Sequence, residues 1–289
     1  MNSKSILQKR LNILYQKTGE LHLRSISGGS INETYHVRFG NASFFCKVNS
    51  ATKFPHLFDT ERNSLTLIGR QNKIKTPAVI DCFEAGEEQF LLLEWIDEGE
   101  RTTAFWKMFG EQLAALHSVK SETCGLEEDN YMGSVPQYNR EMADWCSFFA
   151  EQRLIPMIER CVENQLLNSI DYKEVEKLIL KLPAIFNEEK PSLLHGDLWS
   201  GNFLCNNNAA PVLIDPAAYH GHRSIDLAMT TLFGGFQKPF YDAYHYHYPL
   251  PENHKEQWAV CNLYPLLIHL YLFGTSYLTS VRNTLRQFA

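Results

Sequence analysis

The stretch from residue 195 to residue 215 limits the fold and chemistry of this chain more than any other part of its sequence. It begins with His-Gly-Asp-Leu-Trp-Ser-Gly-Asn at residues 195–202, and a short apolar run then leads into Asp215. Asp197, Asn202 and Asp215 carry carboxylate and amide oxygens, which suit a hard cation such as magnesium. A carboxylate near an attacking hydroxyl and oxygen ligands for magnesium are the groups that phosphoryl transfer requires. This stretch therefore predicts a phosphoryl-transfer site.

The spacing within the stretch is that of a kinase catalytic loop. Asn202 follows Asp197 by five residues, as in the H-R-D-L-x-x-x-N loop of protein kinases, and Asp215 lies where those enzymes carry the aspartate of D-F-G. Taken singly, H-G-D can arise by chance, and Asp or Asn beside Gly is often only a turn former. The joint occurrence of these residues in this order, after a β-rich region, favours phosphoryl transfer.

Each polar residue of the stretch has its own expected role. We expect Asp197 to orient the substrate hydroxyl and accept its proton, and Asn202 and Asp215 to bind magnesium. His195 is interpreted as a brace for the loop backbone that transfers no proton. Trp199 offers a broad aromatic face that could pack a sugar-like substrate or could fill the core, and the sequence leaves both alternatives open.

The order of predicted elements separates a β-rich beginning from a helical remainder. Strands are predicted at residues 21–27, 34–39, 42–48, 79–84 and 89–96, and helices at 7–17 (with Leu7, Leu11, Leu14 and Tyr15 on one face) and 58–70. Beyond a polar hinge at 97–100, helices are predicted at 103–119, 144–161 (kinked at Pro156), 172–186, 225–233 and 258–287. We therefore predict an α+β, protein-kinase-like two-lobed fold. A small five-stranded antiparallel N-lobe would cover residues 1–96, and a larger, mostly helical C-lobe would cover 97–289.

A glycine-containing segment between the first two strands predicts a cover over the phosphates of a nucleotide. Gly28, Gly29, Ser30 and Asn32 belong to the run Gly-Gly-Ser-Ile-Asn. Glycines let backbone N–H groups approach phosphate oxygens without hindrance from a Cβ atom. The run is not a G-x-x-x-x-G-K-[ST] P-loop, and by itself it could be only a hairpin turn.

Lys47 lies in the middle of an apolar strand, where an unpaired charge would be costly to bury. Contact with ATP phosphates and with a carboxylate would satisfy it. Glu61, early in the next helix, is the natural partner, although Asp59 and Glu84 could compete. The alternative is an edge-strand lysine whose ammonium group reaches solvent.

The end of the last strand before the hinge predicts the site of the nucleotide base. Leu93, Glu94, Trp95 and Ile96 occupy this position. In a kinase fold, backbone groups here would hydrogen-bond the edge of adenine, so side-chain identity carries little information. ATP and Mg²⁺ are therefore the expected cofactors.

Composition and charge argue against several classes of protein. The net charge of −6 and the lack of basic runs argue against a nucleic-acid surface. We also expect no membrane span and no signal peptide, because no segment approaches about 18 apolar residues. Seven cysteines without a C-x-x-C pair predict buried reduced thiols and a cytoplasmic location. The spacing of His245, His247 and His254 matches no zinc pattern, so the His- and Tyr-rich segment 241–248 is expected to serve packing or a substrate groove.

Beyond these motifs, the chain resembles the fructosamine-3-kinase (ketosamine kinase) family over nearly its whole length. This family is a branch near the aminoglycoside phosphotransferases and choline kinases. The resemblance lies in residues 28–32, 113–117, 129–137, 148–154, 195–202, 215–217, 219–222, 226–229 and 233–236. Residues 129–137 and 148–154 distinguish it from aminoglycoside kinases, which share only the broad H-G-D, N and D plan. Family members commonly carry Gly at the position of Ser200 and often Cys at that of Ser30, so control through a thiol in that loop is not expected.

The resemblance implies a specific reaction and substrate. It implies phosphorylation of the C3 hydroxyl of a ketosamine, such as a fructosamine or ribulosamine, with ATP and magnesium, in a reaction that repairs glycation. The substrate would be a free or protein-bound ketosamine, with no nucleic acid or membrane partner and an open oligomeric state. The residues themselves indicate only phosphoryl transfer, and fold-level likeness cannot select the substrate. A kinase of the aminoglycoside or choline type and a nucleotide-binding pseudokinase scaffold are the alternatives. Asp226 is interpreted as a further brace for the catalytic loop.

Overall fold

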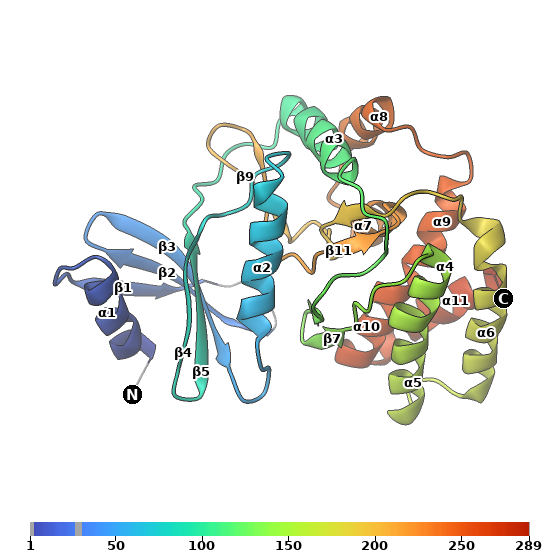
Figure 1. Cartoon of the computed structure of the whole chain (residues 1–289), viewed down its shortest axis with the longest axis horizontal. Coiled ribbons are helices and arrows are strands. Elements are labelled where there is room, and N and C mark those ends of the chain that lie inside the picture. Colours follow the sequence, from blue (N-terminus) through green and yellow to red (C-terminus); the bar gives the residue numbers. More distant parts are fainter. Residues whose placement is uncertain (1–2, 27–30, 289) are drawn as a thin grey trace.

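The computed structural model describes residues 3–26 and 31–288, and it confirms the predicted α+β fold. A sheet-rich N-terminal part lies at one side of the molecule, and a mostly helical C-terminal part lies at the other (Figure 1). The chain passes from the first part to the second between the end of β5 (Glu88–Glu94) and the start of α3 (Thr103–His117).

The N-terminal sheet has five antiparallel strands in the order β1-β2-β3-β5-β4. The other strands are β1 (Leu21–Ser25), β2 (Glu33–Phe39), β3 (Ala42–Ser50) and β4 (Val79–Ala85). Gly40, with a φ of 60°, makes the tight turn between β2 and β3 because glycine adopts this left-handed conformation without steric cost. The five predicted strands therefore agree with the structure to within a few residues at their ends.

Helix α1 (Ser3–Leu14) packs one face of the sheet with Leu7 and Leu11, which are fully buried. The helix ends at Leu14, whose side chain is 42% exposed. The expectation that Leu14 continues the buried face is therefore wrong. Gln16, with a φ of 49°, turns the chain toward β1.

Helix α2 (Leu57–Arg70) packs against the opposite face of the sheet. Its Leu57, Phe58 and Leu65 form one apolar cluster with Leu91 and Leu93 of β5. Because successive side chains of a strand point to opposite faces, Cys46 and Val48 of β3 belong to the cluster under α1, and the intervening lysine faces α2. The alternation within β3 thus aims one buried cation at α2.

The C-terminal part is built from helices around two apolar clusters. Besides α3, its main helices are α6 (Ser169–Ile185), α7 (Ser224–Leu232), α8 (Lys238–His247), α9 (His254–Cys261), α10 (Leu263–Phe273) and α11 (Leu278–Phe288). Helices α3 and α8 pack together through the rings of Phe109 and Phe240, whose centroids are 5.1 Å apart. Helix α8 spans most of the segment 241–248, for which no helix was predicted.

Two predicted long helices are divided in the structure. Residues 145–163 form α4 (Trp145–Phe149), a π-helical turn η1 (Ala150–Leu154) and α5 (Ile155–Glu163). Pro156 lies in the first turn of α5, directly after the π-helical turn, and because proline has no N–H to donate to the preceding helical turn, the interruption falls immediately before it, close to the predicted kink. The predicted helix 258–287 is divided by Asn262 and by Gly274, whose φ is 86°, and the 3-10 turn η2 (Thr275–Tyr277) follows the glycine.

Three short antiparallel pairs position the loops of interest. Strand β8 (Ser192–Leu194) pairs with β11 (Tyr219–Gly221), and β9 (Phe203–Cys205) pairs with β10 (Pro211–Leu213). Strand β8 leads directly into the 195–202 loop, and β10 leads into Asp215. The third pair is the hairpin of β6 (Asn130–Met132) and β7 (Val135–Gln137).

Two expectations from composition concern helices and cysteines. Across residues 3–26 and 31–288, no helix has the length and apolar character needed to cross a membrane. All seven cysteines lie within residues 3–26 and 31–288 and are free thiols, and only Cys82 and Cys146 are not fully buried. The prediction of buried, reduced thiols is therefore confirmed for most of them.

Candidate active site

A cavity of about 500 Å³ lies where the sheet-rich part faces the helical part. Lys47 and Glu61 line it from the sheet and α2, and Asp197, Asn202 and Asp215 line it from the helical part. These five side chains come from four segments that lie far apart in the sequence. The fold therefore brings the charged and amide residues singled out above to a single cavity.

Lys47 is the charged centre of the cavity wall on the sheet side. Its Nζ lies 2.7 Å from Glu61 Oε1 and 2.8 Å from Asp215 Oδ1, while its side chain is only 2% exposed. Burial alone would lower the pKa of Lys47, but the negative charges of Asp215 and Glu61 raise it above its ordinary value. The lysine is therefore held as a cation that connects α2 with the Asp215 loop.

Asp197 and Asn202 form a hydrogen-bonded pair in the catalytic-type loop. Asn202 Nδ2 donates to Asp197 Oδ2 at 2.9 Å and to the backbone oxygen of Asp197 at 2.8 Å. One carboxylate oxygen of Asp197 is thus held by the amide, and Asp197 Oδ1 has no hydrogen bond to the described residues. Such an oxygen can accept a proton from a hydroxyl group placed in the cavity.

The environment of Asp197 changes its acidity. Burial and the negative charge of Asp215 raise the pKa of Asp197 to about 8, and the hydrogen bond from Asn202 opposes this shift. When ionised, a carboxylate with a raised pKa is a better proton acceptor than an ordinary one, which suits a general base.

Asp215 adopts a backbone conformation that residues other than glycine rarely adopt, with a φ of 55°. The backbone on both sides is anchored to the catalytic-type loop. Ile214 N donates to Asn202 O at 3.1 Å, and Ala217 N donates to His195 O at 2.9 Å. Strain of this kind persists only where surrounding contacts hold it, and it is commonly found at functional sites.

Asp226, in the first turn of α7, holds the backbone of the catalytic-type loop by hydrogen bonds. Its fully buried carboxylate accepts hydrogen bonds from the backbone N–H groups of His195 at 2.7 Å and Gly196 at 2.9 Å, and it pairs with His117 Nε2 at 3.1 Å. Burial would raise the pKa of Asp226, but these hydrogen bonds, led by that from His117, lower it below its ordinary value. Asp226 is thus an ionised anchor for the loop backbone.

Two buried histidines complete this framework. His195 Nε2 donates to Ile214 O at 2.9 Å, while its Nδ1 accepts from Asp197 N at 3.2 Å, so both ring nitrogens are occupied by backbone groups. Burial lowers the pKa of His195, which keeps the ring neutral. The other ring nitrogen of His117 pairs with the hydroxyl of Tyr244 at 2.8 Å, so this tyrosine of the segment 241–248 packs beneath the loop and does not line the cavity.

The donor set in the cavity fits magnesium. Asp215 and Asn202 present oxygen atoms, which hard divalent cations prefer to nitrogen or sulfur. The amide nitrogen of Asn202 is engaged by Asp197, so its Oδ1 is the atom left for a cation, and it has no hydrogen-bond partner among the described residues. Asp215 Oδ2 is likewise left when Oδ1 pairs with Lys47.

The structure describes only some of the residues predicted to bind the nucleotide. Gly28, Gly29 and Ser30 lie outside the described residues. Asn32 lines the cavity, and its Oδ1 accepts a hydrogen bond from Asn49 Nδ2 of β3 at 2.6 Å.

The predicted adenine segment, Leu93–Ile96, does not line this cavity. Leu93 packs in the cluster under α2, and the Glu94 carboxylate pairs with Lys75 at 2.8 Å. The Trp95 ring stacks on His36 at 3.9 Å between centroids. The backbone of this segment therefore remains a predicted contact for a nucleotide base, and it lies outside the lining of the charged cavity.

An aromatic wall forms another side of the cavity, and of its members only Trp199 was singled out from the sequence. Trp199 packs edge-on to Phe233 at 5.9 Å, Phe233 lies 4.8 Å from His269, and His269 lies 5.1 Å from Tyr277. Gly201 permits the position of Trp199, because a Cβ atom there would lie 2.3 Å from its ring. The aromatic residues of α10 and η2 look like ordinary core residues in the sequence, so no local signal reveals that they face a cavity.

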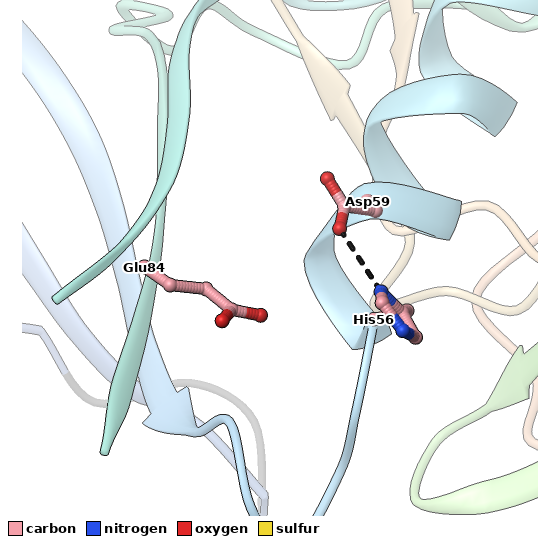
Figure 2. Close-up of side chains that lie close together, drawn as sticks. All are labelled: His56, Asp59 and Glu84. Atoms are coloured by element: carbon pink, nitrogen blue, oxygen red, sulfur yellow. Dashed lines mark hydrogen bonds and ion pairs between the residues drawn. The ribbon is translucent and has the colours of Figure 1, made fainter. Parts of the chain in front are cut away.

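A second cluster of ligand-type side chains lies outside the cavity, and Figure 2 shows its members. The ligand atoms of His56, Asp59 and Glu84 all lie within 4.8 Å of one another. The cluster lies at the surface, and Arg62 already pairs with Asp59 at 3.0 Å, which neutralises part of its charge. Asp59 and Glu84 therefore do not compete with Glu61 for Lys47.

Comparison of the sequence with known proteins identifies its family. A family model described as fructosamine kinase matches residues 3–289. A protein of Lactiplantibacillus plantarum named "probable ketoamine kinase" is 36% identical over 273 residues, which cover 92% of this chain and 94% of that protein.

Solved structures agree with this result. A crystal structure of a candidate fructosamine-3-kinase from Thermobifida fusca has a TM-score of 0.87 and 33% identity, and the match covers 97% of both chains. A candidate fructosamine-3-kinase from Haemophilus somnus has a TM-score of 0.89 and 27% identity, covering 98% of this chain and 96% of that one. An aminoglycoside phosphotransferase, with a TM-score of 0.65 and 14% identity over 99% of both chains, shares the fold and thereby confirms its kinase-like character.

Proposed function

The chain belongs to the fructosamine kinase family, and from this premise we propose that it transfers the γ-phosphoryl group of ATP to the C3 hydroxyl of a ketosamine. One observation carries the proposal. Lys47, with Glu61, contacts Asp215 at the wall of the same cavity that holds the hydrogen-bonded pair of Asp197 and Asn202. This arrangement supplies a phosphate-binding cation, a proton acceptor and oxygen ligands for a metal, which phosphoryl transfer needs together.

In the proposed mechanism, Asp197 acts on the substrate hydroxyl. Its free carboxylate oxygen orients the C3 hydroxyl and accepts the proton as the new oxygen–phosphorus bond forms. The bond between the γ-phosphorus and the bridging oxygen breaks, and ADP leaves with that electron pair. Lys47 contacts the nucleotide phosphates, while Glu61 keeps its ammonium group in place.

Asn202 and Asp215 are the residues that would hold magnesium. The bound ion would offset negative charge on the transferring phosphoryl group. The two residues reach the cavity from loops that hydrogen bonds connect, so their spacing is maintained by backbone contacts. We propose that residues 1–96, including the segment 28–32 and the backbone of 93–96, bind the nucleotide, and that residues 97–289 carry the metal-binding and acceptor side.

The aromatic wall supports a sugar-amine acceptor. Aromatic faces pack against the C–H faces of sugar rings, and they also attract cations such as a protonated amine. The acidic residues lining the cavity are Glu61, Asp197 and Asp215, each of which already has a role at the phosphoryl side. No extra carboxylates among the described lining residues are left to bind a polycation, which favours a ketosamine over an aminoglycoside.

The proposed function is tested by ADP release with three acceptors measured side by side. Ribulose-lysine and fructose-lysine should support ATP- and Mg²⁺-dependent turnover, and an aminoglycoside should not. NMR of the product should place the phosphate on C3. Turnover with the aminoglycoside alone would replace the proposed acceptor, and binding of ATP without turnover on any acceptor would favour the nucleotide-binding scaffold.

Removing the aromatic face of Trp199 should weaken acceptor binding selectively. For Trp199→Ala we expect the KM for the ketosamine to rise about tenfold, equivalent to about 1.4 kcal/mol, because a stacked aromatic contact is lost. The KM for ATP should stay within about twofold, since the ring belongs to the acceptor wall.

Tyr271→Ala is the matched control for this variant. Tyr271 and Trp199 are both 36% exposed, but Tyr271 does not line the cavity. The control should leave both KM values unchanged. Equal changes in the two KM values of Trp199→Ala would place the ring in general support of the loop instead.

A further inference from the structure

The β6–β7 hairpin places two buried amide side chains against the segment that follows Asp215. Asn130 and Gln137 are cross-strand partners at the base of the hairpin, and they are 3% and 1% exposed. Each strand has only three residues, which is too short to hold a position by its own ladder. The side-chain contacts of these amides therefore decide where the hairpin lies.

The two amides form a directed series of hydrogen bonds, which we call the amide relay. Tyr264 of α10 donates its hydroxyl to Gln137 Oε1 at 3.1 Å. Gln137 Nε2 donates to Asn130 Oδ1 at 2.8 Å and to Ala217 O at 3.3 Å, and Asn130 Nδ2 donates to Ala218 O at 2.9 Å. Both polar atoms of each amide are thus used, and the relay ends on two consecutive carbonyl groups.

These two carbonyl groups belong to the short segment between Asp215 and β11. The backbone N–H groups of the same residues are also engaged: Ala217 N donates to His195 O, and Ala218 N donates to Ser64 Oγ of α2 at 3.3 Å. The segment is therefore held by the catalytic-type loop, by α2 and by the relay at once. Since Asp215 lies two residues earlier in a left-handed conformation, its carboxylate position depends on these attachments.

The hairpin and the residues just before it also contact α2 and the segment that leads into this helix. Tyr131 Oη donates to Pro55 O at 3.0 Å, and Asn63 Nδ2 of α2 donates to Glu128 Oε1 at 2.8 Å. Helix α2 carries Glu61, the partner of Lys47. The hairpin thus connects the helix that orients Lys47 with the segment that orients Asp215.

We propose that Gln137, acting through Asn130, is a positioning residue that holds Asp215 in the geometry needed to bind a divalent cation with the nucleotide. This inference rests on the proposed function, in which Asp215 is a cation ligand. Residues that orient the ligands of a metal commonly change metal affinity by about 10- to 100-fold when they are replaced. Gln137 is the residue to test, because Asn130 lines the cavity and could also touch the substrate.

The test measures binding of Mn²⁺, a spectroscopic substitute for Mg²⁺, by electron paramagnetic resonance in the presence of a non-hydrolysable ATP analogue. Gln137→Met keeps the length of the side chain and removes its hydrogen bonds. We expect its Mn²⁺ affinity to fall about tenfold or more, with kcat reduced to a similar degree. Tyr264→Phe removes only the first donor of the relay, so its Mn²⁺ affinity should fall by about two- to fivefold.

Asn139→Ala is the matched control, because Asn139 is also a fully buried amide of this region. It bonds Glu128 O and Arg153, and it makes no hydrogen bond to residues 217–218. Its melting temperature should fall, while its Mn²⁺ affinity should remain that of the wild type. If Gln137→Met melts lower but binds Mn²⁺ as the wild type does, the amide only stabilises the fold and the inference is overturned.

Three further outcomes complete the test, and the second separates the inference from the proposed function. If Gln137→Met does not fold, Tyr264→Phe decides the matter, and wild-type Mn²⁺ affinity in a folded Tyr264→Phe protein overturns the relay. If the wild-type protein binds Mn²⁺ with the ATP analogue but phosphorylates no ketosamine, the proposed acceptor fails, while the positioning role is still measured by Mn²⁺ affinity. If the wild type binds no Mn²⁺, both proposals fail.

Discussion

Replacing Asp197 by asparagine is expected to lower kcat by at least about a hundredfold, because the variant loses the positioned proton acceptor. Asparagine has nearly the same shape as aspartate and can still contact Asn202, so the loop should keep its form. The KM for ATP should change little, since Lys47, Glu61 and Asp215 remain in place. Steady-state phosphorylation of a ketosamine, measured by ADP release at saturating substrates, provides the check. Turnover within tenfold of the wild type would remove Asp197 from the role of general base.

The same variant should be more stable than the wild type when no ligand is bound. Because burial and Asp215 raise the pKa of Asp197 to about 8, the folded state holds the charged carboxylate at a cost. That cost is absent below about pH 4, where folded and unfolded chains are both protonated, and it is complete above about pH 8.

Melting curves in a chelating buffer at pH 5 and pH 9 test this expectation. After allowance for solvent screening, Asp197→Asn should gain on the order of 1 kcal/mol at pH 9, or about 2–4 °C in melting temperature. The gain should be smaller at pH 5. A variant that is less stable than the wild type at pH 9 would contradict the raised pKa.

Replacing Asp226 by asparagine should cause the largest loss of stability among the substitutions considered. The carboxylate is fully buried and accepts from His195 N, Gly196 N and His117 Nε2. An amide would turn an NH₂ group toward at least one of these donors and would leave it without an acceptor. We expect the free energy of unfolding to fall by about 3–5 kcal/mol, the range for breaking a buried charged contact.

Urea denaturation followed by tryptophan fluorescence measures this loss. Asp242→Asn is the control, because Asp242 is well exposed and pairs with Lys238 on the surface of α8. The control should change the free energy of unfolding by less than about 1 kcal/mol. A loss of that small size for Asp226→Asn as well would show that the loop backbone does not depend on this carboxylate.

Most elements of the fold could be predicted because local patterns and burial agree. Alternation in β2 and β3 places apolar side chains under α1, and the structure has these strands at the predicted positions. A kink near Pro156 could be predicted, but the π-helical form of this interruption could not. The π-helical turn η1 surrounds the buried Arg153, whose guanidinium lies 4.1 Å from the ring of Tyr219, a residue far away in the sequence. No local pattern can reveal such a contact.

The residues of the candidate site likewise include some that the sequence could predict and some that it could not. The spacing of Asp197, Asn202 and Asp215 and the buried position of Lys47 follow from the chemistry of their neighbours in the sequence. Apart from Trp199, the aromatic wall could not be predicted, because Phe233, His269 and Tyr277 become neighbours only when the end of α7, α10 and η2 pack together. Likewise, nothing local distinguishes Gln137 from a surface glutamine.

The sequence by itself determined the order of strands and helices, the chemical types available for phosphoryl transfer and the family to which the chain belongs. These properties depend on residues that are near one another in the chain or on the pattern of the whole. Only the tertiary structure decided which carboxylate pairs with Lys47, which rings face the cavity and which amides hold the segment after Asp215. Each of these contacts joins side chains from separate elements, and packing of the two parts of the molecule brings them within reach.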